Sequence, residues 1–150
     1  MTVQKMLRRT ILYSSATPCV SRTTCLQALV SGASQKYLDK SLEVTVDCFA
    51  YDLEDSVTPS RKVEARKLVR RVIDQLIPSD IMGRAVRINS VAFGLAVPDL
   101  KELVSSPNSM PILVPKVDSA SDLIGTIDAI AHLRAKDQSN PPPIYILALI

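Results

Sequence analysis

The sequence has few of the residue types on which catalysis and metal binding most often depend. Its 150 residues include one histidine, four glycines and no tryptophan. No GxGxxG or Walker pattern surrounds the glycines, so a phosphate-cradling glycine loop is excluded. The single histidine, His132, adjoins the apolar stripe of a predicted helix, and we interpret it as a surface or boundary residue rather than a general base.

Other shortages narrow the class of protein further. The three cysteines, Cys19, Cys25 and Cys48, are odd in number and lack metal-ligand spacing, which favours reduced thiols in an intracellular protein. No apolar run approaches the ~20 residues of a membrane helix. The net charge is only +3, and no basic block is interleaved with aromatic residues, so nucleic acid is not a predicted partner. Hydrophobic content of 47% and charged content of 22% fit a soluble globular protein.

Acidic residues are absent from the beginning of the chain. No Asp or Glu precedes Asp39, although basic residues occur throughout that stretch. A basic, acid-free and Ser/Thr-rich start resembles an organelle transit peptide, and a chance absence or an unusual insertion is the alternative. We therefore assign residues 1–8 to a basic N-terminal extension and expect a mitochondrial location, with cytoplasm or peroxisome as alternatives.

The rest of the chain alternates between strand-like and helix-like patterns. Strands are predicted over residues 9–13, 44–52, 84–90, 111–117 and 144–150. Helices are predicted over residues 34–42, between the prolines at 59 and 78, over 98–104, and from a capping box formed by Ser119 and Asp122 onward. The second and fourth of these helices have predicted apolar stripes, which are Ala65, Leu68, Val69, Val72 and Leu76 in the second and Leu123, Ile124, Ile127, Ile130 and Ala131 in the fourth. This order predicts an α/β fold with a parallel sheet, either open or closed into a barrel.

Charged residues gather where the predicted strands end. Asp52, Glu54 and Asp55 follow the second strand, Arg87 lies in the third, and Lys116 lies near the end of the fourth. Strand alternation would point Asp52 and Glu54 to one face and Asp55 to the other. The carboxyl ends of parallel strands are where ligands bind, but a salt-bridge network that holds the strand ends is an equally good interpretation. The forked guanidinium of Arg87 suits bidentate binding of a substrate carboxylate.

Six segments carry a family resemblance: RRTILY, SQKYLDKSL, DCFAYDLEDSVTPSRKVEAR, AVRINS, LVPKVDSASDL and ILALI. In this order they resemble the citrate lyase beta-subunit-like proteins, the citramalyl-CoA and malyl-CoA lyase branch of the HpcH/HpaI aldolase family. The resemblance implies a (β/α)8 TIM barrel, of which residues 9–150 would form about the first five β/α units. It also implies a Mg²⁺-dependent carbon–carbon lyase that acts on a 3-hydroxyacyl-CoA thioester, or the reverse Claisen-type condensation.

The same resemblance implies roles for individual residues. Substrate-binding positions, for an acyl-CoA and a small 2-oxo acid, are Tyr13, Lys36, Lys40 and Arg87, with Arg87 on the acid's carboxylate. A supporting charged cluster under the metal site consists of Asp52, Glu54, Asp55 and Lys116. No residue is assigned as a catalytic acid or base. The Mg²⁺ ligands are expected beyond Ile150, and the full-length family member is expected to be a homo-oligomer.

Two departures from the family pattern leave the activity open. Residues 14–29 separate Tyr13 from the VSGAS segment, and we interpret them as an atypical insertion, with a genuine surface loop as the alternative. Removing them would restore LYVSGASQKYLDKSL, with Ser31 where the family has proline. The chain also ends at Ile150, one step before the first expected metal ligand. A catalytically inactive truncated fragment or gene-model product is therefore the alternative prediction.

Overall fold

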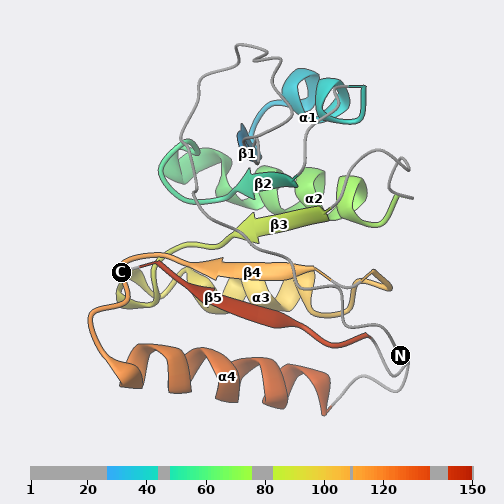
Figure 1. Cartoon of the computed structure of the whole chain (residues 1–150). Helices are drawn as coiled ribbons and strands as arrows, with labels where there is room; N and C mark the ends of the chain where they lie inside the picture. The colour runs from blue at the N-terminus through green and yellow to red at the C-terminus, as the bar shows by residue number, and fades with distance from the viewer. Residues whose placement is uncertain (1–26, 44–47, 76–82, 109, 136–141, 150) are drawn as a thin grey trace.

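Five parallel strands form one sheet in the computed structural model, which describes residues 27–43, 48–75, 83–108, 110–135 and 142–149. The strands pair in chain order, so each lies beside the next one along the sequence. They are β1 (Gln27–Ser31), β2 (Cys48–Asp52), β3 (Gly83–Arg87), β4 (Pro111–Val114) and β5 (Tyr145–Ala148). Figure 1 shows β2 to β5 side by side with their carboxyl ends at one edge. The predicted α/β fold with a parallel sheet is confirmed.

A helix follows each of the first four strands. The helices are α1 (Gln35–Ser41), α2 (Lys62–Ile73), α3 (Ala96–Leu103) and α4 (Ala120–Arg134), and short 3₁₀ turns precede α2 and α3. Successive helices pack against one another. The capping box predicted for α4 is present, with Ser119 and Asp122 each bonding the other's backbone. None of the helices in the described ranges is long and apolar enough to cross a membrane.

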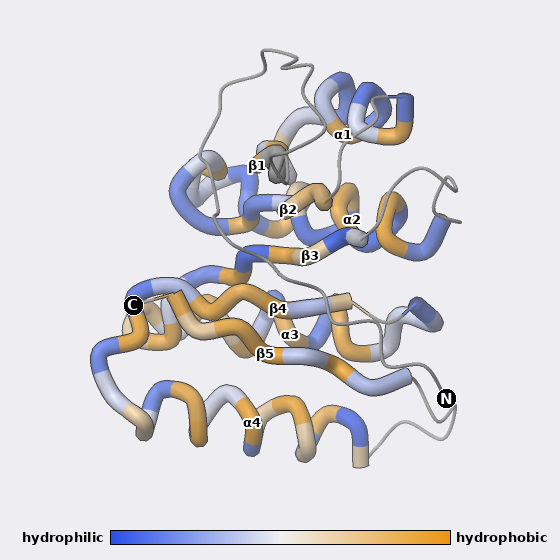
Figure 2. The backbone as a smooth tube through the Cα atoms, viewed as in Figure 1, coloured by the Kyte–Doolittle hydropathy of each residue, from blue (hydrophilic) through white to orange (hydrophobic). Residues whose placement is uncertain are grey.

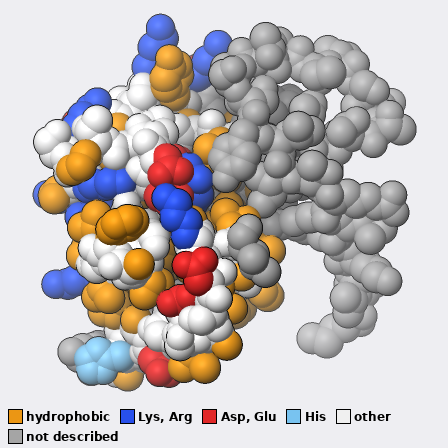
Figure 3. Space-filling model, turned by 90° about the vertical axis from the view of Figure 1, so that its left-hand side faces the viewer, with side chains coloured by type: hydrophobic (Ala, Val, Ile, Leu, Met, Phe, Trp, Pro, Cys, Tyr) orange, Lys and Arg blue, Asp and Glu red, His pale blue; other side chains and the backbone are white. Residues whose placement is uncertain are grey.

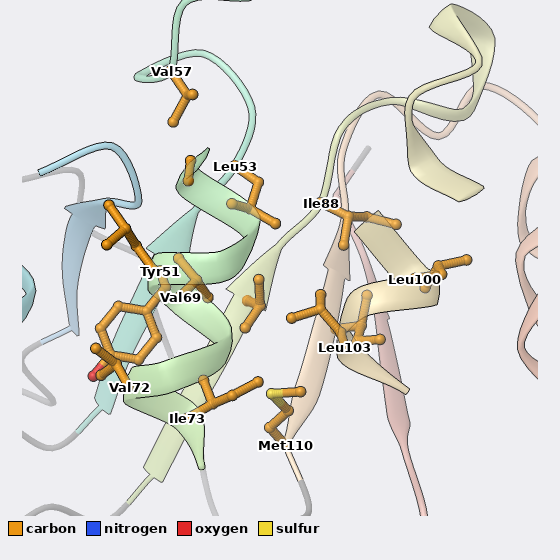
Figure 4. Packing of buried hydrophobic residues seen from close by; sticks show 14 of the residues in the cluster. Tyr51, Leu53, Val57, Val69, Val72, Ile73, Ile88, Leu100, Leu103 and Met110 are labelled. Carbon is orange, nitrogen blue, oxygen red and sulfur yellow. The ribbon is translucent and has the colours of Figure 1, made fainter. Parts of the chain in front are cut away.

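The main core lies between the sheet and helices α2 and α3 (Figure 4). Tyr51 and Leu53 from the β2 region pack there with Val69 of α2 and Leu103 of α3, and all four are fully buried. A smaller apolar cluster of Ala50, Ala85 and Leu113 lies on the opposite sheet face. Every residue of β2 is buried, which is typical of a strand covered on both faces. Figure 2 shows hydrophobic residues along β4 and β5 and recurring along α4.

The start of the sheet differs from the sequence prediction. The predicted first strand, residues 9–13, lies outside the described residues. The structure instead pairs Gln27–Ser31 with Cys48–Asp52, so residues 27–29, assigned to the insertion, belong to β1. The strand therefore runs directly into the VSGAS turn. The rest of the predicted insertion also lies outside the described ranges.

The buried face of α4 differs from the predicted one as well. The predicted stripe consisted of Leu123, Ile124, Ile127, Ile130 and Ala131. In the structure Thr126 and Ile130 are buried, whereas Ile124 and Ile127 are 57% and 51% exposed. Apolar residues line more than one side of α4, so periodicity alone did not determine its rotation. Packing against α3 determines it.

Candidate active site

The acidic segment after β2 forms a tight turn that Asp52 organises. The Asp52 carboxylate accepts hydrogen bonds from the amides of Glu54 (2.8 Å) and Ser56 (3.0 Å). A side chain that bonds backbone amides two and four residues ahead turns the chain instead of extending the strand. Glu54 and Asp55 therefore leave the strand at the carboxyl edge of the sheet.

Arg87 lies directly opposite Asp52 in the register of β3 and β2. Its Nε and Nη2 donate to the two oxygens of Asp52 at 2.9 and 2.8 Å. Its Nη1 lies 3.1 Å from Glu54 Oε2 and 3.6 Å from Asp55 Oδ2. Arg87, Asp52 and Glu54 are almost fully buried, and the Asp55 side chain is 62% exposed. One guanidinium thus binds all three acids of the turn.

Lys116 reaches two of these acids, Glu54 and Asp55, from a bulge after β4. The amide of Leu149 donates to Val114 and the amide of Val117 donates to Leu149, so Pro115 and Lys116 lie outside the ladder. Lys116 has a φ of 52°, a left-handed conformation that is costly for a lysine. Its Nζ lies 2.9 Å from Glu54 Oε1 and 3.4 Å from Asp55 Oδ1. The strand predicted for residues 111–117 therefore ends early, and a strained residue aims its amine at the acids.

These contacts define an acid–base cluster of Asp52, Glu54, Asp55, Arg87 and Lys116. Figure 3 views the face where the strands end and shows acidic and basic side chains together near its middle. The prediction that Asp55 points away from Asp52 and Glu54 is wrong, because β2 ends at Asp52 and the chain turns. The predicted salt-bridge network is present.

Contacts within the cluster shift the pKa values of Asp52 and Lys116. Burial by itself raises the pKa of Asp52, but hydrogen bonds from Arg87, Ser56 and the Glu54 amide outweigh it, and the pKa lies below its usual value. The carboxylate of Glu54, more than that of Asp55, raises the pKa of Lys116. Both oxygens of Glu54 are buried, and within the described part of the chain neither accepts an aligned hydrogen bond. Glu54 is thus held mainly by the charges of Arg87 and Lys116.

A second buried network lies directly behind the cluster and was not predicted. The Lys62 ammonium donates to the carbonyls of Leu53 (2.7 Å) and Glu54 (2.6 Å) and to Asn89 Oδ1 (2.6 Å). Burial lowers the pKa of Lys62, while the nearby carboxylates, Asp99 first, oppose that shift. The spacing could have revealed the network, because Lys62 and Arg66 fall on the same helical face as Ala65 and Val69.

Asp99 of α3 completes this network. It accepts hydrogen bonds from Arg66 Nε (2.6 Å), from the Asn89 amide and from Asn89 Nδ2 (2.7 Å each). Asp99 is fully buried, and Arg66 and Asn89 are nearly so. The loop that follows Arg87 is therefore tied to both α2 and α3.

The structure does not bring Lys36 or Lys40 into the cluster. Lys36 and Lys40 are exposed on the first and last turns of α1, and Tyr13 is outside the described residues. In the described ranges no three His, Cys, Asp or Glu side chains are placed to hold a metal ion. The cluster carboxylates are engaged by Arg87 and Lys116, so these residues do not by themselves fit a Mg²⁺ site.

Comparison with known proteins identifies the family. The model of the HpcH/HpaI aldolase/citrate lyase family matches residues 27–150. The chain belongs to this family. The match begins at the first residue of β1 and spans the whole acid–base cluster.

Individual relatives agree with this assignment. The mitochondrial citramalyl-CoA lyase of Homo sapiens is 33% identical, and the match covers 75% of this chain and 33% of the relative. A (3S)-malyl-CoA thioesterase of Cereibacter sphaeroides is 30% identical over 67% of this chain and 35% of its own length. The citrate lyase subunit beta of Escherichia coli is 28% identical over 87% of this chain and 42% of its own length. The matches thus span about a third to two fifths of these relatives.

Proposed function

We propose that this chain provides the acid-binding part of the active site of a carbon–carbon lyase. The reaction would be the cleavage of a 3-hydroxyacyl-CoA thioester of the citramalyl-CoA or malyl-CoA type, or the reverse Claisen-type condensation that forms such a thioester. The observation that carries the proposal is the position of Arg87, held at the carboxyl ends of the strands by Asp52 and facing Glu54 and Asp55. A guanidinium whose orientation is set in advance can bind an acid without reorganising as charge develops.

The geometry narrows how Arg87 would hold a substrate. Its Nε–Nη2 edge is already paired with Asp52, so the bidentate grip expected from the sequence would have to use the Nη1–Nη2 edge as long as that buried pair stays closed. The contact with Asp55 is longer, at 3.6 Å, and lies on an exposed side chain. We infer that the carboxylate of the small 2-oxo acid replaces Asp55 at Nη1.

Other residues would serve the CoA part of the substrate. Lys36 and Lys40 are exposed cations on the helix that follows β1, and CoA carries phosphates that such cations attract. With Tyr13 they remain the proposed contacts for CoA. The Mg²⁺ dependence that the family resemblance implies also stays a prediction, because the described carboxylates pair with cations. By analogy with the mitochondrial human relative, we propose a mitochondrial location.

Turnover of the candidate thioesters tests the proposal. The purified protein is incubated with citramalyl-CoA or malyl-CoA and Mg²⁺, and release of acetyl-CoA with pyruvate or glyoxylate is followed by mass spectrometry. We expect cleavage of one thioester, and Arg87→Lys should lower kcat/KM by about 100-fold. Arg61→Lys, which alters an exposed arginine paired with Glu64, is the matched control and should stay within about twofold. An absence of turnover from properly folded protein would favour the inactive alternative.

A further inference from the structure

We propose that Lys62 is the positioning residue of the acid–base cluster. Its ammonium holds the turn that carries Glu54 and Asp55 in the place where these acids meet Arg87 and Lys116. The effect of Lys62 on catalysis rests on the proposed function. The effect of Lys62 on the order of the turn does not depend on that function.

The three donors of Lys62 are fully used. An ammonium has three N–H groups, and Lys62 places them on three acceptors at 2.6 to 2.7 Å. Two of the acceptors are consecutive backbone carbonyls, those of Leu53 and Glu54. Successive carbonyls point to opposite sides in an extended strand, so one cation can bind both only where the chain turns. Lys62 therefore selects the turned conformation of the acidic segment.

The third acceptor links this turn to the strand that carries Arg87. Asn89 lies two residues after Arg87, and its amide oxygen accepts from Lys62. Its backbone amide and its Nδ2 both donate to Asp99, which sets the direction of the Asn89 side chain. A single ammonium thus fixes the Glu54 turn relative to the loop that directly follows Arg87 of the cluster.

Covering this face of α2 does not by itself require a cation. Lys62 is 8% exposed and lies on the face of α2 that buries Ala65 and Val69. An apolar side chain could cover the same surface without the desolvation cost of a buried charge. It could not hold the carbonyls of Leu53 and Glu54. The charge of Lys62 therefore serves to hold the turn in its conformation.

Arg84 provides a matched control for substitution of Lys62. It is also a buried cation, and it donates to the carbonyls of Val72 and Gln75 at the opposite end of α2. Lys62→Met and Arg84→Met each remove a buried cation that binds two carbonyls of the backbone. Only the first change touches the turn beside the cluster.

Amide hydrogen exchange of the whole protein measured by NMR is the first readout. The amides of Glu54 and Ser56 donate to Asp52 and report on the turn. Lys62→Met should lower their protection by about tenfold or more beyond any change in global stability, and Arg84→Met should not. Equal protection of these two amides in both variants would overturn the proposal.

Steady-state kinetics with citramalyl-CoA is the second readout. Lys62→Met should lower kcat about tenfold with a less than threefold change in KM, and Arg84→Met should stay within twofold. If the wild-type protein shows no turnover, the proposed function fails, and the exchange comparison still decides the role of Lys62. If Lys62→Met does not fold, Lys62→Gln replaces it in both measurements. Failure of both variants to fold would overturn the proposal by making Lys62 a requirement of the whole fold.

Discussion

Arg87 donates from Nε and Nη2 to both carboxylate oxygens of Asp52, at 2.9 and 2.8 Å, across directly paired positions of β3 and β2. Both side chains are buried, with exposures of 7% and 0%. Asp52 also accepts the amides that turn the chain at Glu54 and Ser56. One carboxylate thus accepts both the amides that turn the chain and the guanidinium that faces the turn.

The first prediction concerns this pair. Asp52→Asn should lower the free energy of unfolding by about 3 kcal/mol or more, because it leaves Arg87 buried opposite a neutral group. Glu64→Gln is the control, since it breaks an ion pair of exposed side chains, and it should change the free energy by less than about 0.5 kcal/mol. Urea denaturation followed by circular dichroism measures both. A loss below about 1 kcal/mol for Asp52→Asn, on the scale of ordinary surface changes, would contradict the prediction.

The second prediction is a pH dependence of stability. Burial raises the pKa of Asp52, but hydrogen bonds led by Arg87 outweigh it, so the folded-state pKa lies below the usual 3.8. A depressed carboxyl pKa adds stability that is fully present above the unfolded-state pKa and is lost as the pH falls through the folded-state value. The urea concentration at the midpoint of unfolding should therefore stay nearly constant from about pH 6 to about pH 4 and decrease at lower pH. The fall should be shallower in Asp52→Asn, and an identical slope in both proteins would refute the assignment to Asp52.

The third prediction contrasts two glycines. A Cβ at Gly32 would lie 2.7 Å from the backbone oxygen of Asp52 and 2.8 Å from a methyl group of Val69. Gly32→Ala should therefore lower the free energy of unfolding by about 1–3 kcal/mol, because β1 and β2 must move apart where they meet Gly32. A Cβ at Gly125, within α4, would meet nothing within 4 Å. Gly125→Ala should therefore raise the free energy of unfolding by about 0.5–1 kcal/mol, because alanine is the better helix former. Opposite shifts of the thermal midpoint are expected, and shifts of the same sign would contradict the close approach at Gly32.

The fourth prediction uses the left-handed conformation of Lys116. Lys116→Gly and Lys116→Ala both remove the amine that faces Glu54, but only glycine relieves the backbone strain at a φ of 52°. The glycine variant should therefore unfold at a higher urea concentration than the alanine variant. On the proposed function both should lower kcat/KM to a similar degree, about tenfold, because both lack the amine. An alanine variant as stable as the glycine variant would show that the strain is absent.

The sequence predicted local features well. The helix that begins after Thr58 and Pro59 and the capping box of Ser119 and Asp122 depend on residues three or four positions apart, and both are present. Of the apolar stripe predicted for α2, Ala65, Leu68, Val69 and Val72 are all buried, and Leu76 lies outside the described residues. These features are determined by neighbouring residues, so they can be read without knowing the rest of the fold.

The members of the acid–base cluster were also predictable. Strand–helix alternation indicated a parallel sheet, and parallel strands bring their carboxyl ends to one edge. Asp52, Arg87 and Lys116 stand near the ends of three successive strands, so proximity followed from topology. What each side chain binds did not follow, because that depends on register and on where each strand stops.

The α/β class, the order of the elements, the family and the residues of the cluster all followed from the amino-acid sequence, because they depend on local periodicity and on short motifs. The folded structure was needed to establish that Gln27–Ser31 pairs with β2, that Asp55 joins Asp52 and Glu54, and that a buried lysine holds their turn. The physical reason is the distance along the chain. Lys62 and Asn89 are 27 residues apart, and Asp52 and Arg87 are 35 apart, so only the folded backbone can bring these partners together.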